Sequence, residues 1–182
     1  MIEKITSLED FLKTMEGASK EEYTALAKRL EIPTEDFKPY MFWDASTYTR
    51  NCIVRTERYE LILLCWEPTH ETPIHCHGGE ECWVKMLQGT IEEKRFLDNG
   101  DDGEPIQNGR IIQKAPNLSY MNDDMGFHSL HNIGQKRAMS LHMYMNPIDA
   151  CRVFDEDKEV FIEKTLQYFS YQGKILEAVG NN

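Results

Sequence analysis

Residues 73–89 read PIHCHGGEECWVKMLQG, and the side-chain directions in this stretch decide how the rest of the chain is interpreted. On an extended strand, residues two apart point to the same face and direct neighbours point to opposite faces. His75 and His77 therefore share a face, while Cys76 points away from them. The pattern predicts two neighbouring imidazoles available to one metal ion, and it separates Cys76 from that site.

Cys82 lies an odd number of residues after His77, so strict alternation would turn its side chain away from the two histidines. Cys82 faces the same interior only if Gly78 and Gly79 form a bulge or loop that resets the alternation. We therefore expect irregular backbone at this glycine pair.

A third metal ligand must come from elsewhere in the chain. The remaining candidates are four histidines, His70, His128, His131 and His142. His128 and His131 are three residues apart, so on one strand only one of them faces the interior. His142 lies in a row with Ser140 and Tyr144 at separations of two, which places a hydroxyl, an imidazole and a phenol on one face. From these residues alone the choice stays open.

The composition limits the kind of protein. A chain of 182 residues with a formal net charge of −11 fits one domain, 1–182, that buries its own core. Nucleic acids and anionic membranes require clustered Lys and Arg, so neither is an expected partner. The N-terminus has no uninterrupted apolar run, so we expect no signal peptide or membrane span. We expect a cytoplasmic monomer that acts on a small molecule.

The cysteines form an odd set without a CxxC motif. Such a set favours a reducing compartment over a disulfide framework, and it does not match a zinc finger. The five cysteines are Cys52, Cys65, Cys76, Cys82 and Cys151.

Residues 1–40 have the pattern of two helices. Ser7 is placed to cap the first, Ser19 and Glu22 form a capping box for the second, and Pro33 ends it. From 45 to 182 the chain alternates between turn-prone clusters and short runs rich in Val, Ile, Thr and aromatic residues. The fold class expected is mainly β, a sandwich or small barrel. The expected strands are 50–55, 59–66, 82–87, 91–96, 110–114, 127–131 and 138–144.

Two further segments carry weaker signals. Residues 160–176, VFIEKTLQYFSYQGKIL, are expected to form a C-terminal hairpin because of their aromatic residues and the Tyr-Gln-Gly turn signal. The acidic loop 98–105 lacks the ligand spacing of a calcium loop and is expected to be a solvated hairpin.

Taken together, the motifs resemble those of the cupin superfamily. An HxH pair, Cys82 and Gly89 are followed far downstream by Gly126, His128 and Asn132, and Cys82 stands where most cupins have a glutamate ligand. A more specific likeness extends from about residue 48 to 154. Its motifs, which resemble those of cysteine dioxygenases, are YTRN at 48–51, ILLCW at 62–66, MLQG at 86–89, GFH at 126–128 and SLHMY at 140–144.

The resemblance implies a small, jelly-roll-like cupin β-barrel with the N-terminal helices packed outside. It also implies one Fe(II) ion per chain, held by His75, His77 and His128, and no organic cofactor. The chain departs from the better-known animal members after SLHMY, where residues 145–147 read MNP instead of Ser-Pro-Pro.

The resemblance further implies that the substrates are L-cysteine and O₂ and that the product is cysteine sulfinic acid. Arg50 and Tyr48 stand at the positions that hold the substrate carboxylate in the family. His142 and Tyr144 stand at positions that contact substrate, and in this chain Ser140 would hold His142. In family members with a cysteine at the Cys82 position, that cysteine can form a thioether with the tyrosine corresponding to Tyr144.

Three alternatives remain at this stage. A dioxygenase for 3-mercaptopropionate is disfavoured because relatives with that preference tend to have glutamine at the position of Arg50. A non-catalytic cupin that binds a metal or small ligand belongs to a different class. A zinc-dependent isomerase is disfavoured by the missing glutamate ligand.

Overall fold

The computed structural model describes residues 3–97 and 104–177. Its N-terminal part contains the helices α1 (Leu8–Gly17) and α2 (Lys20–Arg29), followed by the 3₁₀ helix η1 (Thr34–Tyr40). The Ser7 hydroxyl accepts a hydrogen bond from the Asp10 N–H at 3.1 Å, and the Ser19 N–H donates to the Glu22 carboxylate at 2.8 Å. These caps confirm the two predicted helix starts. The sequence did not predict η1.

The remainder of the described chain is mostly β-strand. The strands are β1 (Thr49–Arg55), β2 (Glu60–Trp66), β3 (Cys82–Gln88), β4 (Thr90–Leu97), β5 (Ile106–Lys114), β6 (Leu118–Met121), β7 (Phe127–Asn132), β8 (Ala138–Tyr144), β9 (Ala150–Asp155), β10 (Val160–Thr165), β11 (Ser170–Tyr171) and β12 (Lys174–Ile175). A short 3₁₀ helix, η2 (Asp123–Met125), precedes β7. All seven predicted strands are present, so the mainly β class is confirmed.

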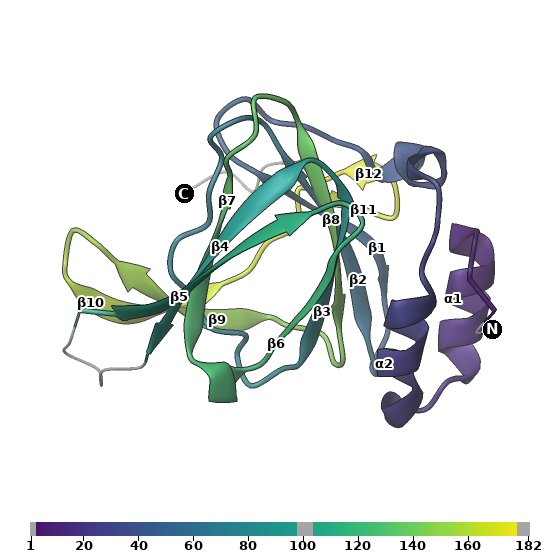
Figure 1. The fold of residues 1–182 in the computed structure, drawn as a ribbon, viewed down its shortest axis with the longest axis horizontal. Helices are drawn as coiled ribbons and strands as arrows, with labels where there is room; N and C mark the ends of the chain where they lie inside the picture. The colour runs from purple at the N-terminus through teal and green to yellow at the C-terminus, as the bar shows by residue number, and fades with distance from the viewer. Residues whose placement is uncertain (1–2, 98–103, 178–182) are drawn as a thin grey trace.

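The strands form one large sheet and two smaller ones. The large sheet has the order β12-β11-β1-β2-β8-β3-β6, and the smaller sheets are β5-β4-β7 and β10-β9. Figure 1 shows α1 and α2 on one side of the large sheet and strands β4, β5 and β7 on the other. The prediction of a barrel is therefore corrected: across residues 3–97 and 104–177, the strands form three separate sheets and do not close into one hydrogen-bonded ring.

Strand β8 explains how the interior is separated from the helix layer. Every residue of this strand is buried, because both of its faces are covered. Met139, Leu141 and Met143 pack in the core beneath the helices. Tyr144 belongs to the second core, between the sheets, and alternation places His142 on the same side.

The C-terminal prediction was only partly right. Strand β10 pairs antiparallel with β9, which the sequence did not predict, and not with the end of the chain. A separate tight hairpin, β11 and β12, turns at Gln172 and Gly173, both with positive φ. Strand β11 pairs in parallel with β1, so the end of the described chain lies beside Arg50. Most of the acidic loop, residues 98–103, lies outside the described residues.

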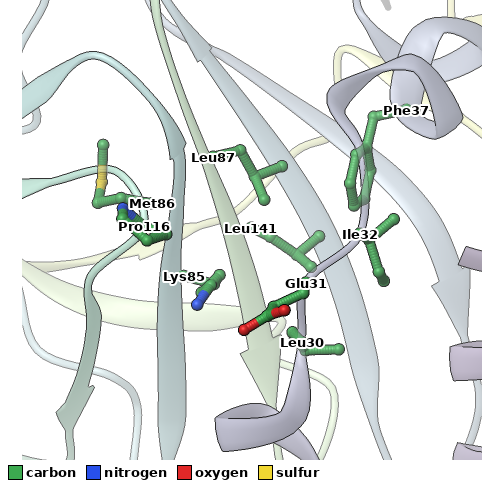
Figure 2. Close-up of a pocket in the computed structure, with 9 residues that line it drawn as sticks. All are labelled: Leu30, Glu31, Ile32, Phe37, Lys85, Met86, Leu87, Pro116 and Leu141. Carbon is green, nitrogen blue, oxygen red and sulfur yellow. The ribbon is translucent and has the colours of Figure 1, made fainter. Parts of the chain in front are cut away.

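None of the helices in the described part of the chain has the length and apolar character needed to cross a membrane. A small cavity of about 80 Å³ lies where the segment after α2 meets β3, and Figure 2 shows Lys85 and Glu31 among its mostly apolar lining residues. It is lined by none of the histidines.

Candidate metal centre and substrate pocket

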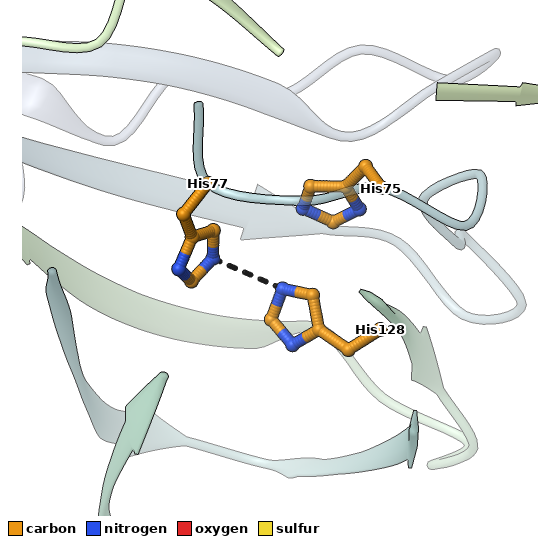
Figure 3. A group of neighbouring side chains, drawn as sticks. All are labelled: His75, His77 and His128. Carbon is orange, nitrogen blue, oxygen red and sulfur yellow. Dashed lines mark hydrogen bonds between the residues drawn. The ribbon is translucent and has the colours of Figure 1, made fainter. Parts of the chain in front are cut away.

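Three histidines from two distant parts of the chain converge between the sheets, as Figure 3 shows. One nitrogen atom each from His75, His77 and His128 lies within 4.8 Å of the others. His77 and His128 are nearly fully buried, and their Nε2 atoms are 3.1 Å apart. Among the described residues this is the group of His, Cys, Asp and Glu side chains that could hold a metal ion.

The second ring nitrogen of each histidine faces an acceptor. The Nδ1 atom of His75 lies 2.9 Å from the Pro73 carbonyl, that of His77 lies 3.4 Å from the Met121 carbonyl, and that of His128 lies 3.4 Å from a Glu93 carboxylate oxygen. In the neutral rings, Nδ1 then carries the hydrogen and donates it, which leaves a lone pair on each Nε2. Converging lone pairs repel each other unless a cation lies between them, so this arrangement fits a metal with a preference for imidazole.

The surroundings keep the imidazoles of His75 and His77 neutral. Burial lowers the pKa of His75 to about 3, with His128 as a second cause, and it lowers the pKa of His77 well below its usual value. A neutral imidazole is the form that binds a metal, because protonation removes the lone pair. Binding at neutral pH would therefore require no loss of a proton from His75 or His77.

Glu93 is a functional candidate that the sequence did not suggest. Its side chain, on β4, is 3% exposed and accepts hydrogen bonds from Arg95 Nε at 2.9 Å and Gln113 Nε2 at 3.2 Å in addition to His128. Burial alone would raise the pKa of the Glu93 carboxyl, but the hydrogen bond with His128 and the positive charge of Arg95 lower it to about 2. A charged carboxylate therefore stands behind one of the three imidazoles.

The glycine pair after His77 forms the predicted turn. Gly78 and Gly79 have φ of 62° and 88°, a region that side-chain-bearing residues seldom adopt. The Asp123 carboxylate holds this turn, because it accepts hydrogen bonds of 2.6 Å from the N–H groups of both His77 and Gly79. Asp123 was not singled out from the sequence.

The turn resets the alternation as expected, and Cys82 faces the interior. Cys82 is fully buried and lies directly opposite Tyr144 on the neighbouring strand, while Glu60 lies opposite Tyr144 on its other side. Burial raises the pKa of the Cys82 thiol far above its usual value, although a hydrogen bond with Tyr144 opposes this effect. The phenol of Tyr144 likewise has a raised pKa, chiefly through burial. Both groups therefore carry their protons at neutral pH.

Arg50 contributes a positive charge to the pocket. A cavity of about 570 Å³ beside the histidines is lined by Arg50, Tyr48, His75, His142 and Tyr144 among others. One guanidinium nitrogen of Arg50 is buried without a hydrogen-bond partner among the described residues. A buried cation with an unused donor is a suitable partner for a small anion such as a carboxylate. Tyr48 stacks on Trp66, with ring centroids 4.9 Å apart.

A hydrogen-bonded chain fixes His142 at the cavity wall. The Trp66 indole N–H donates to the Ser140 hydroxyl at 3.0 Å, and that hydroxyl lies 2.9 Å from His142 Nε2. These two contacts link the indole, the hydroxyl and the imidazole in one chain and fix the orientation of the His142 ring. Burial lowers the pKa of His142 to about 3, so this ring is neutral.

The other histidines lie apart from the group. His70 is held in a loop, where its Nδ1 accepts from the Glu67 N–H at 3.0 Å. His131 follows His128 on β7 but points away from the interior, in agreement with the expected alternation. Cys76 also faces away: its sulfur accepts hydrogen bonds from the N–H groups of Gly78 and Arg152. The five cysteines are all free and buried.

Comparisons with known proteins agree with this geometry. The chain is 32% identical over 139 residues to cysteine dioxygenase type 1 of Homo sapiens, which covers 75% of this chain and 70% of that protein. It is 29% identical over 163 residues to cysteine dioxygenase type 1 of Danio rerio, which covers 84% of this chain and 81% of that protein.

Structural similarity extends to more distant proteins. The crystal structure of TT1209 from Thermus thermophilus superposes with a TM-score of 0.50 at 15% identity, over 61% of this chain and 94% of that one, which concerns the fold alone. The family model described as cysteine dioxygenase type I matches residues 1–157, most of the chain and all three converging histidines. The chain therefore belongs to the cysteine dioxygenase type I family.

Proposed function

We propose that this protein is an iron-dependent cysteine dioxygenase that converts L-cysteine and O₂ into cysteine sulfinic acid. Both oxygen atoms are added to the sulfur, so the reaction balances without an external reductant or an organic cofactor. The observation that carries the proposal is that one ring nitrogen from each of three histidines lies within 4.8 Å of the others, beside a cavity lined by Arg50 with its unused donor. The family assignment does not favour the alternative functions.

The residues that would hold Fe(II), one per chain, are His75, His77 and His128. When bound, the iron would supply positions for the thiolate and for O₂ and would mediate electron transfer between them. Three neutral imidazoles leave the 2+ charge of the ion uncompensated, which suits a substrate that brings its own anion. Binding next to this charge favours the thiolate form of cysteine over the thiol.

Arg50 would bind the substrate carboxylate. Its buried, unused guanidinium donor can form a charge-assisted hydrogen bond, and losing such a contact in a desolvated site costs about 2–5 kcal/mol. Tyr48, stacked on Trp66, forms the adjacent wall and can donate its phenol hydrogen to the same carboxylate. These two contacts would orient the sulfur toward the histidines.

Tyr144 would donate a hydrogen bond to the oxygen-bearing end of the substrate. Its phenol remains protonated because burial raises its pKa, and its ring lies 5.6 Å from that of His77. His142 stacks beside it, with ring centroids 6.5 Å apart, and Ser140 fixes the orientation of His142. The group would hold a proton close to the sulfur and oxygen atoms without giving it up to solvent.

We also propose that turnover joins Cys82 to Tyr144 by a thioether bond. A carbon–sulfur bond forms between the thiol sulfur and the phenol ring, the S–H and one ring C–H hydrogen are lost, and O₂ accepts the two electrons. The direct cross-strand pairing of the two residues supports the proposal. After turnover the intact mass should fall by the mass of two hydrogen atoms, and Cys82→Ser should show no such change. An unchanged wild-type mass would refute the cross-link.

The test of the main proposal is an aerobic assay with Fe(II) and L-cysteine, in which oxygen uptake and cysteine sulfinic acid are both measured. His128→Ala should abolish product formation, because it removes one of the three convergent nitrogen atoms. His131→Ala, on the same strand but outside the group, is the matched control and should retain activity. Activity that survives His128→Ala would refute the ligand assignment.

The same assay separates the alternatives. A clear preference for 3-mercaptopropionate over cysteine would replace the proposed substrate, and oxygen uptake no greater than that of free iron would indicate a binding module. Metal analysis of the purified protein distinguishes iron from zinc.

We further propose that the protein is a cytoplasmic monomer. The five free, buried thiols support a reducing environment. Light scattering after size-exclusion chromatography measures the oligomeric state directly, and a dimer mass would refute the monomer.

A further inference from the structure

Arg50 is held in place by the C-terminal part of the chain. Its guanidinium carbon lies 5.8 Å from the centroid of the Tyr168 ring, a distance at which a cation and an aromatic face attract each other. Tyr168 also lines the cavity that contains Arg50. The guanidinium that would bind the substrate carboxylate therefore lies against an aromatic ring.

The far end of the Tyr168 ring is fixed in turn. Arg55 donates from Nη1 to the Tyr168 hydroxyl at 2.8 Å and from Nη2 to the Asp149 carboxylate at 2.7 Å. Its Nη1 atom is also 3.5 Å from the carboxylate of Glu60, which is fully buried and accepts a 3.3 Å hydrogen bond from the Ile148 N–H. Tyr168 thus stands between two arginines: its hydroxyl is held by Arg55, and its face lies near Arg50.

The backbone around Tyr168 is anchored to the strand that carries Arg50. The Phe169 N–H donates to the Arg50 carbonyl at 2.8 Å, and Ser170 pairs with Asn51 in the parallel β11–β1 ladder. The Ser170 hydroxyl also donates to the Asn51 side-chain oxygen at 2.8 Å in a buried position. Figure 1 shows β11 beside β1. Tyr168 is therefore part of a fixed wall of the pocket.

This wall lies beyond residues 1–157, the range that the family model matches. From these contacts we infer that Tyr168, held by Arg55, is a positioning residue that orients Arg50 toward the carboxylate of the thiol substrate. The C-terminal segment then determines how strongly this chain prefers thiols with a carboxylate over thiols without one. The inference rests on the proposed function for the identity of the substrate.

The experiment measures binding without turnover. The Fe(II)-loaded protein is titrated under nitrogen with L-cysteine and with cysteamine, the same aminothiol without the carboxylate, and both dissociation constants are determined by calorimetry. Tyr168→Leu should raise the dissociation constant of cysteine about 2- to 30-fold, the range of a cation–π contact, and leave that of cysteamine unchanged. Tyr168→Phe keeps the ring but loses the Arg55 contact, so it should weaken cysteine binding less.

Tyr171→Leu is the matched control. The Tyr171→Leu substitution removes a ring of the same size from the same segment. The centroid of the Tyr171 ring lies 5.9 Å from that of Tyr168, but Tyr171 is outside the cavity lining. Its cysteine affinity should remain at the wild-type value. Melting temperatures establish that each variant is folded. If Tyr168→Leu does not fold, the affinities of Tyr168→Phe are used for the test.

Three results would overturn the inference. These are an equal loss of affinity for both thiols, no loss for either in the Tyr168 variants, or a wild-type protein that binds cysteine no more tightly than cysteamine. A wild-type protein that prefers cysteine but forms no sulfinic acid in air would refute the proposed function and leave the role of Tyr168 standing.

Discussion

Replacing Glu93 with glutamine should weaken metal binding while the fold is retained. The Glu93 carboxylate accepts from His128, Arg95 and Gln113 in a nearly fully buried position. Glutamine has the same shape but no charge, and its single oxygen cannot serve all three donors. His128 would then lose the negative partner that makes its Nε2 atom a stronger ligand.

The expected size of the effect follows from these contacts. Removing the hydrogen-bond partner of a metal-binding histidine typically reduces metal affinity about 10- to 100-fold, which corresponds to about 1.4–2.8 kcal/mol. The metal-free protein should also lose about 1–3 kcal/mol of folding stability, because the half-buried Arg95 loses its charged partner.

The assay is competition for Fe(II) against a coloured chelator under nitrogen, combined with thermal melting of the metal-free protein. Glu92→Gln provides the control, since Glu92 is the adjacent carboxylate on β4 but pairs with Arg110 and Lys94 on the other face of the strand. Equal iron affinity in wild type and Glu93→Gln, or an equal loss in Glu92→Gln, would refute the role assigned to Glu93.

Two further predictions concern stability. The folded-state pKa of His75, about 3, is below its ordinary value of 6.5, so between these pH values the unfolded chain binds a proton that the folded protein does not. The urea midpoint of the metal-free protein should therefore fall as the pH is lowered from 6.5. A midpoint that does not change with pH would contradict this reasoning. Gly78→Ala should destabilise the protein by more than about 1–2 kcal/mol, because its φ is positive and the added Cβ would lie 2.4 Å from the Ala150 carbonyl oxygen. Gly79→Ala also places a side chain at positive φ, but in open space, so its urea midpoint should fall less, and an equal fall would rule out the steric cause.

Hydrophobic periodicity was a sufficient guide wherever the chain forms a long regular element. The caps at Ser7 and Ser19 placed both helices, and strand β8 has the predicted bounds. Strand β6 was missed because its four residues, LSYM, are too few to display a period. The helix η1 was missed because it contains Pro39 and lacks an apolar stripe.

Side-chain parity likewise predicted the relative directions of His75, Cys76 and His77, and it identified the glycine turn as the condition for Cys82 to face inward. It could not select the third histidine, because His128 is 51 residues from His77 and only the tertiary fold brings them together. Glu93 and Asp123 were missed for the same reason: in sequence, each is one acidic residue among many, and its partner is 35 or 46 residues away.

The segment that carries His75 and His77 has a consequence for how the two halves of the interior stay together. His75 forms an isolated β-bridge to His128 of β7 on one side and another to Val153 of β9 on the other. The described segment around His75 is therefore not part of a named strand. The segment thus runs between the two smaller sheets and is joined to them by backbone hydrogen bonds at separate positions instead of a continuous ladder. An ion held by His75, His77 and His128 would link this segment to β7. Metal binding and the contact between the segment and β7 would then stabilise each other by mass action. In this protein the metal centre that would activate cysteine would also stabilise the packing of the segment that carries His75 and His77.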